Sequence, residues 1–455
     1  MSKTVLRNLR LLVLICIGYM GSLLHAQDSG QEPIAFTIGQ EDAITFPPGS
    51  TLSFNKVITR LGPSNYFNFP GVFTSPADGI YKFQVYAMSI SNKIWLELYK
   101  NQELVASLYG SSSNSYATTG NAVILILKQG DEVWVQSNAI FDITLYNQTG
   151  QLYTTFSGVR LVTENGIDTI IAFSATLISS KIIPPGTTIL YDKLLLNQGD
   201  GYNNLTGVFT APVPGVYIFH FFSLSDINQS ISQDLYHNNE YICSLSGLTP
   251  DDKAQAGNTV ILHLKSGDHV QVKSQQTNIL YGVSNQIFST FSGALIGADA
   301  LLSSGSEGMV AFSAGLTRSI AEIPSTMIAF NRIFTNLQHA YDQRTGNFTA
   351  PIQGVYEFIV HIKGQPTHPG FLLLYHNSRI ILNLFAVNQI QQGNVQVQHG
   401  IAGNSVIIHL LVGDSVYLEA GIDSINALYG GYNQVHCTFS GYLIAPTYNR
   451  LPIVG

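Results

Sequence analysis

Histidines and carboxylates are the side chains that most often carry catalysis or metal ions, and this sequence spreads them thinly. The densest histidine segment is HIKGQPTHPGFLLLYH (361–376), whose spacings fit no compact metal motif. Glu41-Asp42 and Asp251-Asp252 are adjacent pairs in turn-like sequence, and neighbours in an extended chain point apart. The sequence also has no G-x-S-x-G, H-E-x-x-H, C-x-x-C or G-x-x-x-x-G-K motif. We therefore expect no catalytic residue, and we expect the histidines to be strand and loop residues on a wet surface.

Four sequons are candidates for covalent modification in an exported chain. They are Asn147-Gln-Thr, Asn204-Leu-Thr, Asn228-Gln-Ser and Asn347-Phe-Thr, and exposed sequons accept N-linked glycans. Asn204 and Asn228 lie in loop-like sequence and are the preferred candidates. Asn347 lies within a repeated turn-to-strand motif, which makes it a weaker one.

The first 26 residues have the features of a secretory signal peptide. Lys3, Arg7 and Arg10 precede the apolar run LLVLICIGYMGSLL (11–24), and the small Ala26 offers a cleavage point. A membrane anchor is the alternative, but the run is shorter than the roughly 20 apolar residues that span a bilayer. We expect a secreted, extracellular chain that starts near Gln27 and has no membrane span.

The charge balance narrows the classes of partner. Removal of the signal segment takes three of 21 basic residues and no acidic residue, so the formal net charge falls from −7 to −10. A mildly acidic chain without a basic block argues against nucleic acid as a general partner.

Two cysteines, Cys243 and Cys437, remain after the signal segment, and both lie in strand-like sequence. They are either two small buried side chains or one bridge between different parts of the chain, and the sequence alone leaves both readings open. In either case the protein does not depend on a framework of disulfides.

One stretch of sequence occurs three times. The copies are YFNFPGVFTSPADGIYKF (66–83), YNNLTGVFTAPVPGVYIF (202–219) and YDQRTGNFTAPIQGVYEF (341–358). Each copy follows an opening segment that starts at Ile34, Ile171 or Val310, and these openings are 137 and 139 residues apart. This spacing is far above solenoid periods of about 20–50 residues, so we expect tandem domains. The predicted division is a signal peptide (1–26), three domains (27–161, 170–296 and 309–444) and a C-terminal tail (445–455).

The repeated stretch is expected to be structural. In GVYEFIVHI (354–362), alternate residues from Tyr356 form an apolar face, and the other face is mixed, which is typical of a half-buried antiparallel sheet. The residues that we assign to the shared structural motif are Gly71, Phe73, Tyr81, Phe83, Gly207, Phe209, Tyr217, Phe219, Gly346, Phe348, Tyr356 and Phe358.

A hairpin signal follows each copy. The segments VILILKQGDEVWV, VILHLKSGDHVQV and VIIHLLVGDSVYL each place a Gly-Asp pair between two strand-like runs. Glycine supplies the positive backbone angle that such turns need. We therefore assign turn roles to Gly130, Asp131, Gly267, Asp268, Gly413 and Asp414, with calcium binding by the aspartates as the weaker alternative. Many short strands with regular turns predict an all-β fold of sandwiches.

An ordered set of motifs carries a resemblance. Phe330-Asn331, the stretch at 341–358, a following His-Asn, the hairpin Gly-Asp and a closing TFSG together resemble the globular-head domain of the complement C1q family. The match spans nearly all of each repeat and is loosest in the first. It implies three tandem ten-stranded jelly rolls, related to the tumour necrosis factor fold, which associate as trimers through apolar faces. It also implies secreted, non-enzymatic binding proteins without a cofactor. Some members hold calcium near the trimer axis, but no calcium ligand can be assigned to these repeats.

The sequence departs from many members of that family. It has no collagen-like stalk with glycine at every third position, and three heads share one chain. The connecting segments VTENGIDTI and GADALLSSGSEGM have nine and thirteen residues and reach at most roughly 35 and 48 Å. We expect the heads to pack as an intramolecular pseudo-trimer, and the low charge content of 11% fits buried faces between them. Separate heads on flexible linkers are the alternative.

Two functional hypotheses follow. The first is a secreted recognition protein of the innate-immune type, in which variable loops bind carbohydrate, microbial-surface or protein ligands and three heads give avidity. Tyr109 and Tyr116, in a variable loop, are candidate ligand contacts. The second is a secreted structural or matrix protein, or a cytokine-like ligand, that presents its trimer-like surface to one partner.

Overall fold

The computed structural model describes most of the chain downstream of the predicted signal segment, which itself lies outside the described residues. The described residues are 33–63, 67–68, 71–112, 116–148, 150–161, 170–249, 252–299, 308–322, 325–366, 368–387, 389–390, 397–421 and 426–447. They are almost entirely strands and loops, with one short 3₁₀ helix, η1 (Leu337–His339). Within these ranges, no helix has the length and apolar character needed to cross a bilayer. We refer to the described residues of 33–161, 170–299 and 308–447 as repeats 1, 2 and 3.

Repeat 1 forms two antiparallel sheets around a core of its own. The first sheet contains, in spatial order, β2 (Ile44–Phe46), β11 (Ile143–Leu145), β6 (Gly79–Ser89), β12 (Thr154–Leu161), β1 (Ala35–Gln40) and β3 (Lys56–Leu61), and β9 (Ala117–Leu127) also pairs with β6. The second contains β4 (Phe67–Asn68), β5 (Val72–Thr74), β10 (Glu132–Ser137), β7 (Lys93–Lys100) and β8 (Glu103–Ser111).

Repeat 2 has the same two sheets, but the strands equivalent to β2 and β11 form a separate pair. The first sheet contains β15 (Lys193–Gln198), β13 (Ala172–Thr176), β24 (Thr290–Ala298), β18 (Gly215–Leu224) and β21 (Gln255–Leu264). The second contains β16 (Tyr202–Asn203), β17 (Val208–Thr210), β22 (His269–Ser274), β19 (Ile231–His237) and β20 (Glu240–Gly247). The pair consists of β14 (Lys181–Ile183) and β23 (Asn278–Leu280).

Repeat 3 follows this order again. Its first sheet contains β27 (Arg332–Asn336), β25 (Ala311–Gly315), β38 (Thr438–Pro446), β30 (Gly354–Lys363) and β35 (Ile401–Leu410). The second contains β28 (Tyr341–Asp342), β29 (Asn347–Thr349), β36 (Ser415–Ala420), β31 (Gly370–His376) and β32 (Arg379–Ala386). Two short pairs are β26 (Ile320–Glu322) with β37 (Asn426–Leu428) and β33 (Gln389–Ile390) with β34 (Val397–Gln398). The prediction of an all-β fold of three sandwiches is confirmed.

The repeated stretch forms the centre of each sandwich core. In repeat 3, the Phe348 ring packs edge-on against Tyr356 and Phe358 at centroid distances of 5.6 and 5.2 Å. The Tyr356 hydroxyl donates to the carbonyl of Ile352 at 2.6 Å, so the phenol is satisfied at the rim of the core. Tyr81 and Tyr217 make the same bond four residues back, to Ala77 and Val213. The aromatic residues of the motif therefore supply packing area rather than chemistry.

The hairpin glycines adopt the left-handed conformation that the turns require. Their φ angles are +91° at Gly130, +88° at Gly267 and +88° at Gly413. In the first hairpin, Asp131 accepts hydrogen bonds from the backbone of Lys128 and from the amide of Asn101, at 2.9 and 3.0 Å. The aspartates thus lie where they tie the turn to a neighbouring strand.

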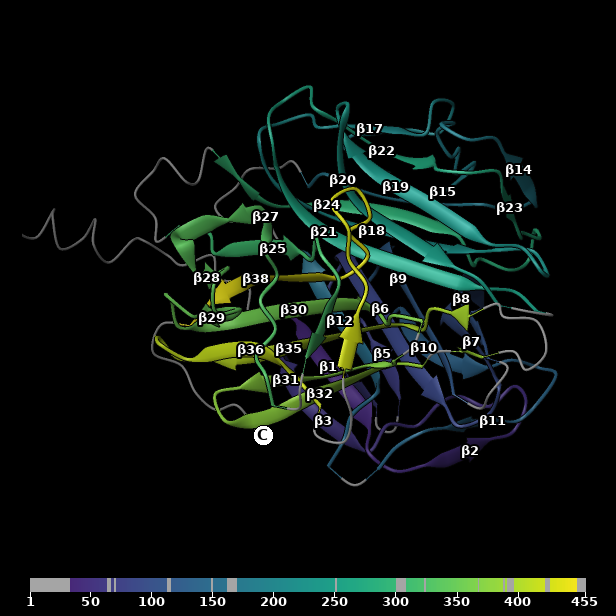
Figure 1. Ribbon diagram of the computed structural model, residues 1–455, viewed down its shortest axis with the longest axis horizontal. Coiled ribbons are helices and arrows are strands. Elements are labelled where there is room, and N and C mark those ends of the chain that lie inside the picture. The colour runs from purple at the N-terminus through teal and green to yellow at the C-terminus, as the bar shows by residue number, and fades with distance from the viewer. Residues whose placement is uncertain are drawn as a thin grey trace, which may run out of the picture. The chain divides into compact units, whose positions relative to one another are not determined.

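The three repeats belong to one compact unit, which spans residues 33–163 and 167–455. In Figure 1 repeat 1 is purple to blue, repeat 2 is teal, and repeat 3 is green to yellow. The strands β6, β18 and β30 lie near the middle of the view, and we call them the central strands. The arrangement agrees with the expected packing of the heads on one another and not with separate heads on linkers.

Candidate functional site

The central strands build a buried junction between the repeats. Their residues alternate, so that one face packs into the repeat's own core and the other faces the neighbouring repeats. Contrary to the expectation of a half-buried sheet, both faces are buried along all ten residues of β30. The mixed face of GVYEFIVHI meets protein rather than water. An apolar cluster that draws on all three repeats covers this junction, and it includes Ile124, Ile218, Ile261, Ile359 and Ile407.

An ion pair lies inside the junction. Lys82 and Glu357, at equivalent positions of β6 and β30, form a salt bridge in which each side chain is only 1% exposed. The third equivalent position is the apolar Ile218. Gln84 donates to the same carboxylate, and the ammonium lies 3.1 Å from the hydroxyl of Tyr442. Burial lowers the pKa of Lys82, although the carboxylate of Glu357 opposes this shift.

Three equivalent rings meet further along the same strands. The centroids of Tyr86, Phe222 and His361 are 5.7 to 6.4 Å apart in pairs. Burial lowers the pKa of His361 to about 3, so its imidazole is neutral at ordinary pH. The expectation of surface histidines is therefore wrong for His361 and also for His220, because the face that carries them is covered by another repeat.

A chain of hydrogen bonds connects side chains of the central strands and of β21. The His361 Nε2 lies 3.3 Å from the Tyr86 hydroxyl and 3.1 Å from the Thr259 hydroxyl, which in turn lies 2.9 Å from His220 Nδ1. The chain therefore links side chains of all three repeats. Each of these buried polar groups needs a hydrogen-bond partner, and a particular neighbouring repeat supplies it. The groups therefore favour one arrangement of the repeats.

A glycine next to each ring permits the close packing. A Cβ at Gly257 would lie 2.0 Å from the ring of Phe222, and one at Gly120 would lie 2.4 Å from Tyr86. A Cβ at Gly403 would lie 2.8 Å from the ring of His361. The glycines are needed because the adjacent strand must pass directly beneath each ring.

An asparagine follows each of these glycines and closes a ring of contacts between repeats. Thr290 of repeat 2 donates to Asn121 of repeat 1 at 2.7 Å. Thr438 of repeat 3 donates to Asn258 of repeat 2, and Thr155 of repeat 1 donates to Asn404 of repeat 3, each at 2.6 Å. Each repeat therefore both donates and accepts once, in a closed cycle.

The sequence contains a signal for these asparagines that the motif analysis did not use. The letters G-N-x-V-I occur at Gly120, Gly257 and Gly403, immediately before the apolar run of each hairpin. The donating threonines are the first letters of the three TFSG segments. Shared sequence thus determines contacts between the repeats as well as the sandwiches themselves.

The two candidate loop tyrosines both pack against another repeat. Tyr109 is 7% exposed, and its hydroxyl donates to Asp252 of repeat 2 at 2.9 Å. Tyr116 packs against Tyr146 and against Phe385 of repeat 3, at centroid distances of 5.1 and 6.0 Å. The hypothesis that Tyr109 contacts a ligand is wrong, because its ring is buried between repeats. Tyr116 is partly exposed, so its role as a ligand contact stays a prediction.

Other aromatic residues lie on the second sheets, outside the interfaces between repeats, and are partly exposed. In repeat 1, Tyr99 of β7 and Trp134 of β10 stack at 5.7 Å with an interplanar angle of 14°. In repeat 3, Tyr375 and Tyr417 stack at the equivalent positions, at 5.2 Å and 4°. We call these two pairs the outer aromatic pairs.

A carboxylate accompanies each outer aromatic pair. The Tyr99 hydroxyl donates to Glu97 at 2.8 Å, and burial together with this carboxylate raises the pKa of Tyr99 to about 12. In repeat 3, Glu419 acts electrostatically on both tyrosines and helps to raise their pKa values, after the larger effect of burial. Repeat 2 differs, because Tyr236 has the ammonium of Lys273 at 5.0 Å from its ring centroid. The three outer sheets therefore offer different chemistry.

The sequons occupy different environments. Asn228 is exposed with a φ of +60°, and Asn204 is partly exposed in a turn. Asn347 is partly buried in β29 and donates to Thr349 at 3.0 Å. Asn147 is 8% exposed and its amide donates to the carbonyl of Gln40. Asn204 and Asn228 remain the predicted glycosylation sites, because a glycan there would displace no buried contact.

The cysteines and the hairpin aspartates take structural positions. Cys243 and Cys437 are free, buried thiols, and burial raises the pKa of both, for Cys437 to about 12. Burial would raise the pKa of Asp268, but hydrogen bonds from Asn238, Lys265 and His237 lower it to about 2. Among the described residues, no group of three or more His, Cys, Asp or Glu side chains is arranged to hold a metal ion.

The fold defines a class of protein: one chain with three β-sandwich heads. Its candidate binding sites are the exposed faces of the second sheets and the interfaces between heads. A family model described as the C1q domain matches residues 35–161, 172–296 and 311–444. The chain belongs to the C1q domain family, and each of its sandwiches is the jelly roll of that family. Proteins of this family are generally non-enzymatic, secreted recognition or ligand-binding proteins.

Known relatives match single repeats. Complement C1q tumor necrosis factor-related protein 2 of Mus musculus is 35% identical over 119 residues, which is 24% of this chain and 38% of the relative. The Homo sapiens protein of the same name is also 35% identical over 119 residues, 24% of this chain and 39% of its own length. The match thus spans about two fifths of these relatives.

Two solved structures cover one repeat each. The globular domain of zebrafish complement 1qA has 19% identity and a TM-score of 0.25, and the match covers 30% of this chain and 99% of that domain. Murine APRIL has 15% identity and a TM-score of 0.24, with coverages of 28% and 99%.

Proposed function

We propose that this protein is a secreted, non-enzymatic recognition protein that binds carbohydrate chains, including those of microbial surfaces, through the outer sheets of its heads. The observation that carries this proposal is the outer aromatic pairs, Tyr99 with Trp134 and Tyr375 with Tyr417. Secretion is supported by the signal-like first 26 residues.

The chemistry of these pairs suits sugars. A flat, partly exposed ring offers apolar area to the C–H face of a sugar, and its rigid side chain loses little entropy on binding. The neighbouring carboxylates, Glu97 and Glu419, can accept hydrogen bonds from sugar hydroxyls. Repeat 2 adds an ammonium, Lys273, beside the ring of Tyr236. A ligand that contains several kinds of sugar would therefore match the chain better than a ligand built from one kind.

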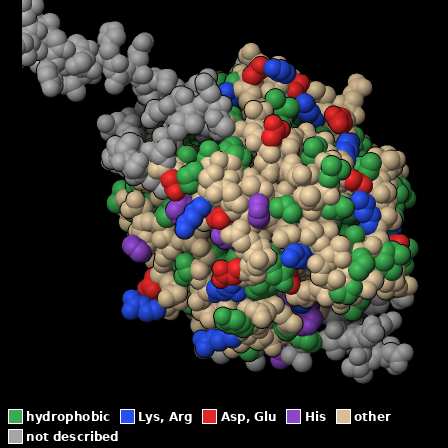
Figure 2. Space-filling view, turned by 90° about the horizontal axis from the view of Figure 1, so that it is seen from above, with side chains coloured by type: hydrophobic (Ala, Val, Ile, Leu, Met, Phe, Trp, Pro, Cys, Tyr) green, Lys and Arg blue, Asp and Glu red, His purple; other side chains and the backbone are tan. Residues whose placement is uncertain are grey.

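Several sites in one compact chain favour repetitive ligands. Two sites held in one unit convert the second binding event into an intramolecular one, which raises avidity without new contacts. On the face drawn in Figure 2, Lys and Arg side chains are interspersed with Asp and Glu rather than gathered in one block. This distribution supports neutral ligands over nucleic acid.

The proposal is tested by screening the purified protein against a glycan array and microbial particles. We expect Trp134→Ala and Tyr417→Ala each to weaken binding at least tenfold, since each removes one stacking surface. The matched control is Tyr432→Ala, because Tyr432 is an exposed ring, 78% accessible, in a loop of repeat 3. Binding that both variants leave unchanged would contradict the assignment of the site.

The same screen distinguishes the alternative function. A structural or cytokine-like ligand would bind one host protein tightly and no glycan or particle. Since the outer aromatic pairs need no metal ion, we expect glycan binding to be the same in EDTA and in calcium. Loss of binding in EDTA would show that calcium takes part.

A further inference from the structure

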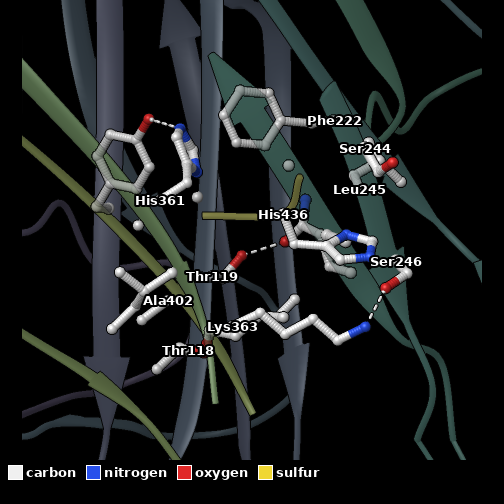
Figure 3. A pocket seen from close by; sticks show the side chains of 18 residues that line it. Thr118, Thr119, Phe222, Ser244, Leu245, Ser246, His361, Lys363, Ala402 and His436 are labelled. Atoms are coloured by element: carbon white, nitrogen blue, oxygen red, sulfur yellow. Dashed lines mark hydrogen bonds between the residues drawn. The ribbon is translucent and has the colours of Figure 1, made fainter. Parts of the chain in front are cut away.

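A cavity of about 40 Å³ lies where the three repeats meet, and the proposed recognition function does not use it. Most of its lining comes from repeats 2 and 3, and Tyr86, Thr118, Thr119 and Gly120 of repeat 1 complete it. Figure 3 shows the side chains around it, with the rings of His361 and Phe222 at one end and Lys363, Ser246 and His436 at the other. A space of this size has room for a small ion or a few waters. The question is which kind of occupant the lining favours.

The cavity exists because this interface lacks a large side chain that the other two have. Ser246 of β20 is equivalent to Tyr109 of β8 and to Phe385 of β32. At the interface of repeats 1 and 2, Tyr109 packs with Leu224 and Phe288 in an apolar cluster. In repeat 3, Lys363 stands at the position of Leu224 and His436 at the position of Phe288. One of the three interfaces is therefore hollow and polar where an equivalent one is filled and apolar.

Among the described residues, no carboxylate pairs with the buried ammonium of Lys363. Lys363 is 8% exposed, and its Nζ donates to the Ser246 hydroxyl at 2.6 Å. Burial lowers the pKa of Lys363 to about 8. The neighbouring Cys437 supplies no negative charge at ordinary pH, because burial raises the pKa of its thiol to about 12. The ring of Tyr429 also faces the ammonium, with its centroid 4.6 Å from Nζ, but it carries no negative charge. Because the hydroxyl and the ring face take up at most two of the three N–H groups, the ammonium keeps a donor for a further partner. Buried charges are ordinarily paired.

Two more polar groups on the lining have no hydrogen-bond partner in the part of the chain that the structure describes. Gln255 is 6% exposed, and its Oε1 accepts from the backbone N–H of Tyr109 at 3.0 Å. That N–H can only donate, so the amide orientation is fixed and its Nε2, a donor, is the group left without a partner. His436 is 7% exposed, and its Nδ1 has no partner among the described residues. Burial lowers the pKa of this imidazole and keeps it neutral, and the ring has a hydrogen bond with the backbone of Ser244, so Nδ1 donates only in the tautomer that carries the proton there. Lys363 and His399 are the charges that act on His436, and both are basic.

We propose that this cavity is a binding site for one small anion of the size of chloride, held by Lys363, Gln255 and His436 at the interface of repeats 2 and 3. The anion neutralises the buried ammonium and accepts a hydrogen bond from the Gln255 amide, and from His436 in the tautomer that carries its proton on Nδ1. It thereby stabilises the contact between the two repeats. This site is separate from the outer aromatic pairs and does not depend on glycan binding.

The test is the thermal unfolding of the purified protein in sodium chloride and in sodium gluconate at equal ionic strength. Above the dissociation constant, each tenfold increase in chloride is expected to raise Tm by about 1–2 °C, while gluconate is too large to enter. Crystals soaked in bromide should show an anomalous peak beside Lys363. An equal Tm in both salts, or no bromide at this position, would overturn the proposal.

Matched variants separate binding from folding. Lys363→Leu and Ser246→Tyr each introduce a residue found at an equivalent position of another repeat, and the double variant mimics the filled interface of repeats 1 and 2. We expect all three to fold and to lose the rise of Tm in chloride. The control is Lys128→Leu, whose side chain is 74% exposed and which should keep the rise. A chloride effect that persists in Lys363→Leu would also overturn the proposal.

Discussion

At the scale of single residues, the ion pair between Lys82 and Glu357 makes the contact between repeats 1 and 3 specific. Three copies of one repeat would bring three like charges together at this position, whereas the actual chain brings together Lys82, Ile218 and Glu357. Like charges in a buried site are strongly unfavourable. The differences between the repeats therefore favour association in one order within one chain.

Removal of one partner of this pair should be costly. We expect Lys82→Ile to lower the free energy of unfolding by about 3–5 kcal/mol, because Glu357 would remain buried and unpaired. The double variant Lys82→Ile/Glu357→Ile, which repeats Ile218 at all three positions, should recover most of that loss. Urea unfolding of the three proteins measures both values, and a double variant as unstable as Lys82→Ile would contradict the interpretation.

The buried histidines predict sensitivity to acid. The folded pKa of His361 is about 3 and that of His220 is well below 6.5, both chiefly because of burial, and His220 also lies near the charge of Lys82. The unfolded chain binds protons on both below about pH 6.5 and the folded chain does not, so stability is complete above that pH. It should fall progressively as the pH drops from about 6.5 toward 3.

A variant identifies the residue responsible. His361→Phe places at this position the side chain that Phe222 has in repeat 2, and it should reduce the loss of stability between pH 6.5 and 4. Unfolding midpoints across this range measure the effect. His339→Asn changes an exposed histidine and should retain the full pH dependence. An identical profile in wild type and His361→Phe would refute the role of this imidazole.

At the scale of elements, the sequence predicted the strands correctly, but it predicted that one face of the central strand of repeat 3 would meet water. The alternation in GVYEFIVHI places Tyr356 and Phe358 on one face and Glu357 and His361 on the other, as found. A mixed face usually meets water. Here the neighbouring repeats cover it, and Glu357 and His361 are satisfied there by residues far away in the sequence. Periodicity reports which residues share a face, but not what covers it.

The close approach of strands at the junction gives a prediction at the same scale. Gly257→Ala would place a methyl group 2.0 Å from the Phe222 ring and force the central strands apart. We expect a loss of about 1–3 kcal/mol in the free energy of unfolding, which is typical of overpacking. Denaturant unfolding checks this value. Phe222→Leu in the same chain should restore part of the loss, and an unchanged stability of Gly257→Ala would contradict the packing argument.

At the scale of the whole molecule, the three heads form one compact unit with three interfaces of different chemistry. The Asn and Thr cycle is common to all three. One interface adds the Tyr109 cluster, one the pair of Tyr116 and Phe385, and one the cavity beside Lys363. A single chain can hold such an asymmetric arrangement because its linkers set the order of the heads.

Scattering in solution tests the compact unit. A compact chain of this length should have a radius of gyration of about 22 Å. Small-angle X-ray scattering of the purified protein from residue 27 measures it. An elongated profile with three separated masses would show that the heads are separate in solution.

The sequence by itself determined the number of domains, their all-β character, their turns and the C1q resemblance, because these depend on local periodicity and on motifs that recur in order. Only the tertiary structure decided which polar residues are buried between repeats. It placed His361, Lys82 and Tyr109 in interfaces rather than in water, and it left the space beside Lys363 open. The physical reason is that burial depends on what covers a face, and here the cover comes from residues more than a hundred positions away.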